Sequence, residues 1–131
     1  MRGTLVKCIA LTAVSFTFAV SAQAADVKSE IMTAEQHATL AAGAQTVDMV
    51  HSHLHHTINC LVGPKGADYD ADELNPCKNN GDGAIPDTDD AAVKQKLKTA
   101  VAKAKAGLHE TDLAAIQKAA TETASILDTA K

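Results

Sequence analysis

The chain has 131 residues, a formal net charge of −4 and only three aromatic residues. An acidic chain with so few aromatic side chains is poorly suited to binding nucleic acid or to stacking on bases, haem or sugars. Its length fits one small domain, whose core must be built mainly from small aliphatic side chains.

Residues 1–24 have the pattern of a bacterial secretory signal peptide. Arg2 and Lys7 give a basic start, an apolar run follows, and the segment ends with the small-residue pattern Ala-Gln-Ala at Ala24. We expect cleavage after Ala24, because the apolar run is short for a membrane span. The mature protein would then be periplasmic or secreted, without membrane insertion, as a single helical domain of residues 25–131. Its sixteen acidic residues and ten remaining basic residues give a net charge of about −6.

The next pattern predicts helix over residues 33–62. Thr33 and Gln36 have the spacing of a capping box at its start. Pro64 stops it, because proline disfavours helical geometry in the residue before it. Apolar residues recur every three or four positions in between, as in an amphipathic helix: Leu40, Ala44, Val47, Val50, Leu54, Ile58 and Leu61.

Gly43 is a weak point inside this periodic segment, because glycine lowers helix propensity. Two interpretations therefore stay open. The segment is one unbroken helix, or it is a short helix over 34–42 followed by a second helix over 45–62.

An acidic segment rich in Gly, Pro, Asn and Asp follows and predicts a long loop over 63–88. Cys77 lies in it, and Cys60 precedes it, which makes these the two cysteines of the mature chain. In an oxidising compartment such a pair forms a disulfide, here one that ties the loop to the end of the preceding helix. Closing a loop of this size stabilises by about 3 kcal/mol. The alternative is a pair of free thiols in a metal site.

Residues 89–130 predict two more helices. Asp87 or Thr88 caps the first, Gly107 ends it, and Thr111 caps the second. The short connection makes the two helices antiparallel neighbours. No segment shows strand-like alternation. We therefore predict an all-α fold, a three- or four-helix up-and-down bundle with one long disulfide-stapled loop.

The segment 51–60 concentrates the metal-binding side chains of the chain. Four of the six histidines lie within six residues, and a cysteine follows one helical turn later. Imidazole and thiolate groups bind borderline and soft transition metals. The candidate metal ligands are His51, His53, His55, His56, Met49 and Cys60.

On a helical wheel these side chains fall on two faces. His51 and His55 are four residues apart on one face, a spacing at which two imidazoles can chelate one ion. The other face carries, in order, Met49, His53, His56 and Cys60. Further ligands would have to come from His109, Met32, an acidic loop residue or another chain.

The second face predicts copper or zinc as the metal. A reduced Cys60 would favour Cu(I), whereas an oxidised Cys60 leaves two histidines and Met49, which still suit copper or zinc. Two assignments stay open here. His51 is either a core histidine bonded to a carbonyl or a ligand, and Met49 is either a packing residue or a ligand.

Enzyme motifs are missing from the sequence. It contains no nucleophile elbow, P-loop, dinucleotide fingerprint or Cys-x-x-Cys-His haem motif. Cys60 and His56 could share a helical face, but pairing with Cys77 favours a disulfide over a catalytic thiolate. We expect a protein that is not an enzyme.

The C-terminal hairpin, which reads KAKAGLH over 103–109 and LAAIQKA over 113–119, together with the clustered histidines, resembles the small periplasmic His-rich metal-binding proteins. The resemblance implies a four-helix bundle that takes up copper and other divalent ions as a buffer, carrier or sensor. The alternative is a non-enzymatic envelope interaction or stress protein, with the histidines as a surface patch. Its partner would be a second copy of the chain or an unknown envelope protein.

Overall fold

Helices make up all the regular structure of residues 25–131, the part of the chain that the computed structural model describes. The predicted signal peptide lies outside these residues. In chain order the elements are α1 (Val27–Gly43), α2 (Val47–Val62), α3 (Ala84–Asp87), α4 (Ala91–Leu108) and α5 (Leu113–Asp128). The predicted all-α fold is confirmed.

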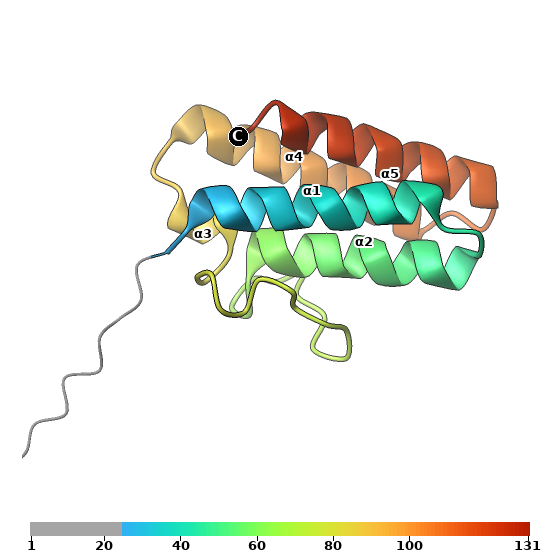
Figure 1. The fold of residues 1–131 in the computed structure, drawn as a ribbon, viewed down its shortest axis with the longest axis horizontal. Coiled ribbons are helices and arrows are strands. Elements are labelled where there is room, and N and C mark those ends of the chain that lie inside the picture. Colours follow the sequence, from blue (N-terminus) through green and yellow to red (C-terminus); the bar gives the residue numbers. More distant parts are fainter. Residues whose placement is uncertain (1–24) are drawn as a thin grey trace, which may run out of the picture.

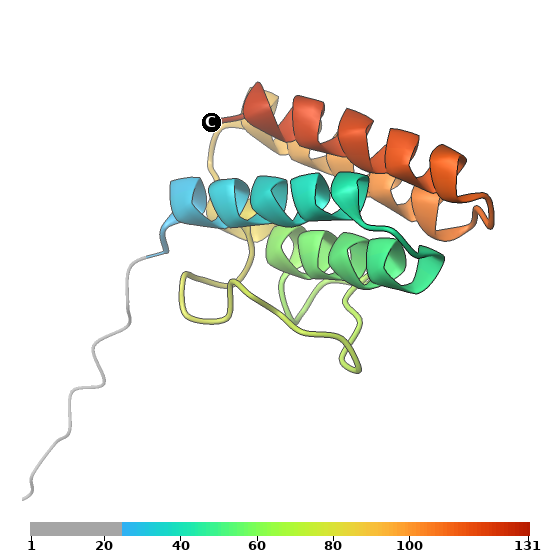
Figure 2. The ribbon, with the colours of Figure 1, turned by 45° about the vertical axis from the view of Figure 1, so that its right-hand side comes forward.

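The four long helices form an up-and-down bundle (Figures 1 and 2). Helix α1 packs against α2 and α5, and α4 packs against α5 and α2, so each long helix has two close neighbours. The loop between α2 and α3 runs along the outer side of α2 (Figure 2), and its Asp68 pairs with Lys105 of α4. The loop thus brings Asp70 and Glu73 next to side chains of α2.

A turn at residues 44–46 separates α1 from α2, so the interpretation with two helices is the correct one. The backbone of Ala44 is extended, and its N–H bonds to the carbonyl of Ala41. Thr46 starts α2, because its hydroxyl accepts a hydrogen bond from the N–H of Met49. The break lets the segment fold back on itself, which buries apolar side chains that one straight helix would leave exposed.

The predicted start of the first helix is wrong. Helix α1 begins at Val27, because the carboxylate of Asp26 accepts a hydrogen bond from the N–H of Ser29 at 2.9 Å. Thr33 and Gln36 lie inside the helix and do not form a capping box. Aspartate is a stronger N-cap than threonine, because a carboxylate also interacts favourably with the helix dipole.

The predicted ends of the last two helices are also corrected. Asp90 caps α4, where residues 87 and 88 were expected, and Asp112 caps α5, where Thr111 was expected. Helix α4 continues through Gly107 to Leu108. A Cβ atom at Gly107 would lie 2.9 Å from Leu54 Cδ1, so this glycine serves close helix packing and does not end the helix.

The core consists of small and medium aliphatic side chains from all four long helices, as the composition predicts. Leu40 departs from the predicted apolar stripe, because it is 45% exposed. The break between α1 and α2 changes the phase of the pattern, so the two helices bury faces that one continuous stripe does not describe. The largest fully buried apolar side chains are Ile31, Leu54, Ile58, Leu61, Leu97, Ile116 and Leu127.

The loop after α2 is fastened to α2 by the predicted disulfide, Cys60–Cys77, whose two residues are buried. The side chain of Asn59, also buried, donates a hydrogen bond to the carbonyl of Asp70 at 2.8 Å and accepts one from its N–H at 2.9 Å. The end of the predicted loop contains the short helix α3. The loop is therefore an ordered layer on α2.

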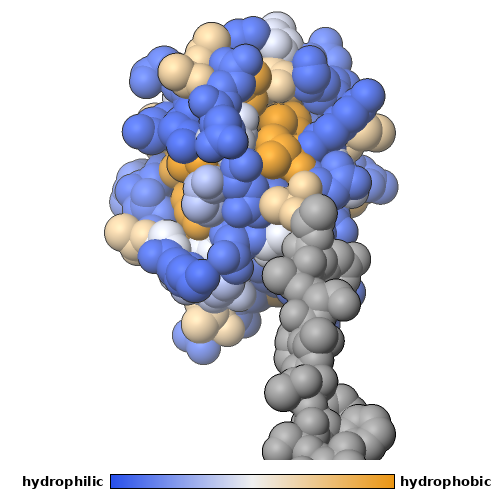
Figure 3. Space-filling model, turned by 90° about the vertical axis from the view of Figure 1, so that its left-hand side faces the viewer, coloured by the Kyte–Doolittle hydropathy of each residue, from blue (hydrophilic) through white to orange (hydrophobic). Residues whose placement is uncertain are grey.

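The end of the bundle that carries α3 has a mostly hydrophilic surface with small apolar patches between the polar side chains (Figure 3). Within residues 25–131, no helix combines the length and the apolar character needed to cross a membrane.

Candidate metal centre

Three histidines from two helices come together on the α1–α2 boundary. His37 lies on α1, and His53 and His56 lie on α2. One ring nitrogen from each lies within 4.8 Å of the others, and all three residues are partly buried. Within the described part of the chain, no other set of three histidine, cysteine or acidic side chains converges in this way. We call His37, His53 and His56 the histidine trio.

The helical hairpin explains why these residues meet. His37 lies eight residues before Gln45, in the middle of the turn, and His53 lies eight residues after it. Antiparallel helices place such residues side by side. His56 follows His53 by three residues and so lies on the same face of α2.

A buried hydrogen bond next to the trio sets the register of α1 on α2. The hydroxyl of Thr57 lies 3.2 Å from the carbonyl oxygen of Ala34, on α1. The same hydroxyl lies 3.0 Å from the carbonyl oxygen of His53. Thr57 is fully buried, so this bond is protected from water. The trio is therefore built on two helices whose relative position is specified.

The distances within the trio suit a small metal ion. His37 Nδ1 and His53 Nδ1 are 3.3 Å apart. Two nitrogens bound to Zn²⁺ at about 2.0–2.1 Å in a tetrahedral arrangement lie roughly 3.3–3.4 Å from each other. The His56 ring stands nearly perpendicular to both other rings, with centroids 5.1 Å and 5.7 Å from those of His37 and His53. The His37–His53 pair thus has the spacing of two ligands of one ion, and a nitrogen of His56 lies within 4.8 Å of both.

The electrostatic environment keeps lone pairs available for a metal. Burial, together with His56 and His53 nearby, lowers the pKa of His37 to about 4. Burial also lowers the pKa of His56, although the carboxylate of Glu73 acts in the opposite direction. These two rings are therefore neutral near pH 7, which is the state in which imidazole binds metals.

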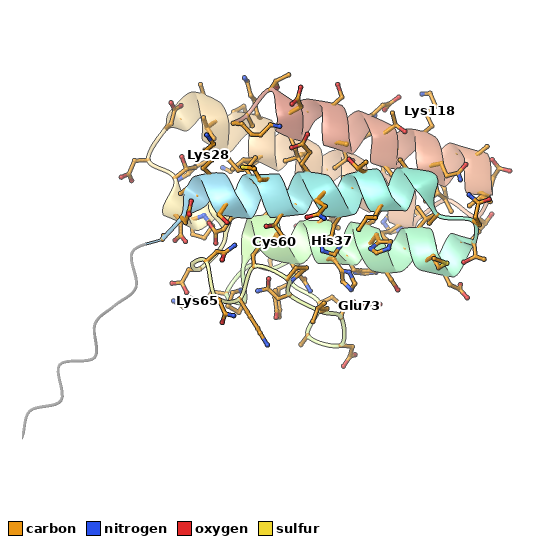
Figure 4. All side chains as sticks on the ribbon, viewed as in Figure 1. Lys28, His37, Cys60, Lys65, Glu73 and Lys118 are labelled. Atoms are coloured by element: carbon orange, nitrogen blue, oxygen red, sulfur yellow. A yellow bond between two sulfur atoms is a disulfide. The ribbon has the colours of Figure 1, made fainter. Side chains whose placement is uncertain are left out.

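The loop adds carboxylates on the solvent side of α2. Glu73 Oε2 lies 3.4 Å from His56 Nε2, and Asp70 Oδ2 lies 3.3 Å from His55 Nδ1. The other ring nitrogen of His56, Nδ1, is buried and has no hydrogen-bond partner. Figure 4 shows His37 on α1 and Glu73 on the loop in the same part of the molecule.

Of the predicted ligands, the structure brings together His53 and His56 but not the whole set. His51 and His55 are outside the trio: Nε2 of His51 is buried without a partner, and His55 faces Asp70. Met49 lies in the first turn of α2 and is 50% exposed.

Cys60 is bonded to Cys77 and so offers no thiolate. The alternative with two free thiols is therefore wrong, and with it the Cu(I) site that needed a reduced Cys60. The physical reason is that the sulfur atoms of a disulfide lack the charge that makes a thiolate a strong ligand. Of the two suggested distant ligands, His109 does not belong to the convergent group, and Met32 is 50% exposed on α1.

His37 is the candidate ligand that the sequence did not indicate. It lies fourteen residues before the nearest other histidine. The signal that could have found it is the combination of Gly43 with Thr46, a residue type that favours helix starts. Placing the turn between them brings His37 opposite His53.

The chain matches no protein-family model, no curated protein and no solved structure.

Proposed function

We propose that this is an exported protein that binds one Zn²⁺ or Cu²⁺ ion through His37, His53 and His56. It would act as a buffer, carrier or sensor of the metal in the periplasm or outside the cell. The observation that carries this proposal is the convergence of three imidazole nitrogens from two helices within 4.8 Å.

The chemistry of the ligand set supports zinc or copper over harder ions. Imidazole is a preferred ligand of Zn²⁺ and Cu²⁺, whereas Ca²⁺ and Mg²⁺ prefer oxygen. No thiolate is available to favour Cu(I), because the described cysteines form the disulfide. Three protein ligands leave a fourth position for water or an exchanging ligand, which suits reversible uptake better than a closed structural site.

Titration calorimetry of the purified protein with Zn²⁺ and with Cu²⁺ tests the proposal. We expect saturable binding of one ion per chain, and at least tenfold weaker binding in His37→Ala, because a three-coordinate site loses a ligand. His109→Ala is the matched control and should bind like the wild type, because His109 lies outside the trio.

Two results would contradict the proposal. One is the lack of saturable binding with a Kd below about 10 µM. The other is an unchanged affinity in His37→Ala. The first result would favour the envelope interaction protein with a His-rich surface, and the second would return the assignment to the clustered histidines of α2 alone.

A further inference from the structure

Glu73 lies directly behind one ring of the trio, on the far side from its free nitrogen. Its Oε2 atom is 3.4 Å from His56 Nε2. The side chain of His56 is only 14% exposed, so few water molecules compete for this nitrogen. Nδ1, the other nitrogen of the same ring, is buried without a hydrogen-bond partner. The ring thus presents one nitrogen to a carboxylate and keeps the other unused.

The backbone around Glu73 is fixed to the same helix that carries His56. Asn59, one turn after His56, donates hydrogen bonds to the carbonyls of Asp70 at 2.8 Å and of Leu74 at 3.2 Å. The next residue of α2, Cys60, forms the disulfide with Cys77. Asp70 precedes Glu73 in the sequence, and Cys77 follows it. Two consecutive residues of α2 therefore hold the loop on both sides of this carboxylate.

We propose that Glu73 is the positioning residue of the metal site. Its carboxylate accepts the Nε2–H of His56, selects that tautomer, and leaves the Nδ1 lone pair of His56 to bind the ion. This inference rests on the proposed function, because it assigns a role within the same site.

The arrangement follows a general rule of metal sites. A ligating histidine donates its second N–H to a carboxylate or carbonyl, which orients the ring and raises the basicity of the ligand nitrogen. The geometry also excludes Glu73 from the convergent group itself, because its oxygens are not within 4.8 Å of all three donor nitrogens. Glu73 therefore acts through His56 and is not a fourth ligand.

The charge of Glu73 also affects which ion the site prefers. Three neutral imidazoles leave the full charge of a bound dication in a partly buried place. A carboxylate in the outer shell offsets part of this charge, and it does so more effectively for Zn²⁺ or Cu²⁺ than for a monovalent ion. By holding the loop on α2, the disulfide would keep the carboxylate of Glu73 close to the bound ion.

Zinc titrations of Glu73→Ala, Glu73→Gln and Asp72→Ala test the proposal. We expect Glu73→Ala to weaken zinc binding by about 10- to 100-fold. Glu73→Gln keeps an acceptor oxygen without the charge, and we expect an intermediate affinity. Asp72→Ala is the matched control, because it removes an exposed carboxylate from the same loop, and we expect wild-type affinity.

A second readout separates positioning from a general loss of structure. Long-range proton–nitrogen correlation spectra report which imidazole nitrogen carries the proton. We expect His56 to be in the Nε2–H form in the metal-free wild type and to bind zinc through Nδ1. In Glu73→Ala we expect a mixture of both tautomers, with helical content unchanged.

Wild-type affinity in Glu73→Ala, or zinc bound through Nε2 of His56, would overturn the role of Glu73 while leaving the histidine trio as the site. Failure of the wild-type protein to bind zinc or copper would instead remove the proposed function, and this inference with it. A Cys60→Ser/Cys77→Ser variant extends the test to the staple: if it folds, its zinc affinity should fall toward that of Glu73→Ala.

Discussion

At the scale of single residues, a partly buried histidine must stay neutral or find a counter-charge. Burial lowers the pKa of His37 to about 4, and the neighbouring imidazoles of His56 and His53 act in the same direction. A metal ion reverses this situation, because it replaces protons as the acceptor of the lone pairs. An environment that disfavours the protonated form of an imidazole thus leaves a lone pair free for a metal ion.

Glu30 is a second buried titratable side chain, at the start of α1 and apart from the trio. It is fully buried, and its Oε1 accepts a hydrogen bond from the N–H of Gly83 at 3.0 Å, while Oε2 has no partner. Burial raises its pKa to about 7, the bond from Gly83 opposes the shift, and the nearby carboxylates of Asp87, Asp26 and Asp82 add to it. Glu30 is therefore protonated in the folded protein under conditions in which it ionises in the unfolded chain.

Glu30→Gln should remove a pH dependence of stability. Because the folded pKa of about 7 exceeds the unfolded value of 4.5, the wild type loses stability as pH rises from 4.5 through 7. We expect the variant to resemble the wild type near about pH 5 and to be more stable by up to about 3 kcal/mol near about pH 8. Urea unfolding at both values measures this, and an equal difference at both would contradict the assignment.

At the scale of elements, the end of the loop, at Asp82 and Gly83, packs against the backbone at Gly63, where α2 ends. Gly63 and Gly83 both have positive φ, of 66° and 117°. A Cβ atom at Gly63 would lie 1.5 Å from the carbonyl oxygen of Asp82. This contact therefore needs glycine for space as well as for conformation. Gly43 differs, because a Cβ atom there would meet nothing within 4 Å.

This contrast gives a matched pair of variants. Gly63→Ala should lower the free energy of unfolding by about 3 kcal/mol or more, because backbone atoms must separate and the φ value is strained. Gly43→Ala should raise it by about 0.5–1 kcal/mol through higher helix propensity. Urea titrations of both variants test the prediction, and a wild-type midpoint for Gly63→Ala would show that the loop does not pack against Gly63.

At the scale of the whole molecule, a small domain with an aliphatic core relies on added links. The disulfide ties the loop to α2, and a metal ion at the trio would tie α1 to α2. An ion that binds the folded state alone stabilises it by mass action, by about 2.7 kcal/mol at a concentration of 100 times Kd. Metal binding at the trio would thus be coupled to folding.

Zinc should therefore raise the melting temperature of the wild type in a concentration-dependent way. At 100 times Kd we expect a rise of about 10 °C, given the size of the domain. His37→Ala should melt at nearly the same temperature with and without zinc. Differential scanning calorimetry measures both, and an equal rise in the two proteins would place the bound ion elsewhere.

The sequence by itself determined what depends on local patterns. Apolar spacing predicted the helices, the composition of 63–88 predicted the loop, and the two cysteines predicted the disulfide that the structure contains. The same spacing placed His53 and His56 on one face of α2. Local rules were less accurate at helix ends, where Asp26 outcompeted Thr33 as a cap. The signal peptide, the export and the resemblance to His-rich metal-binding proteins stay predictions.

Only the tertiary structure shows that His37 joins His53 and His56, and that Glu73 lies next to His56. His37 reaches His53 only because the chain turns at 44–46 and Thr57 sets the register of the hairpin. Glu73 reaches His56 only because Asn59 and the disulfide hold the loop on α2. Periodicity describes which side of a helix a residue occupies. It carries no information on what another segment brings to that side, because such contacts depend on the packing of the whole domain.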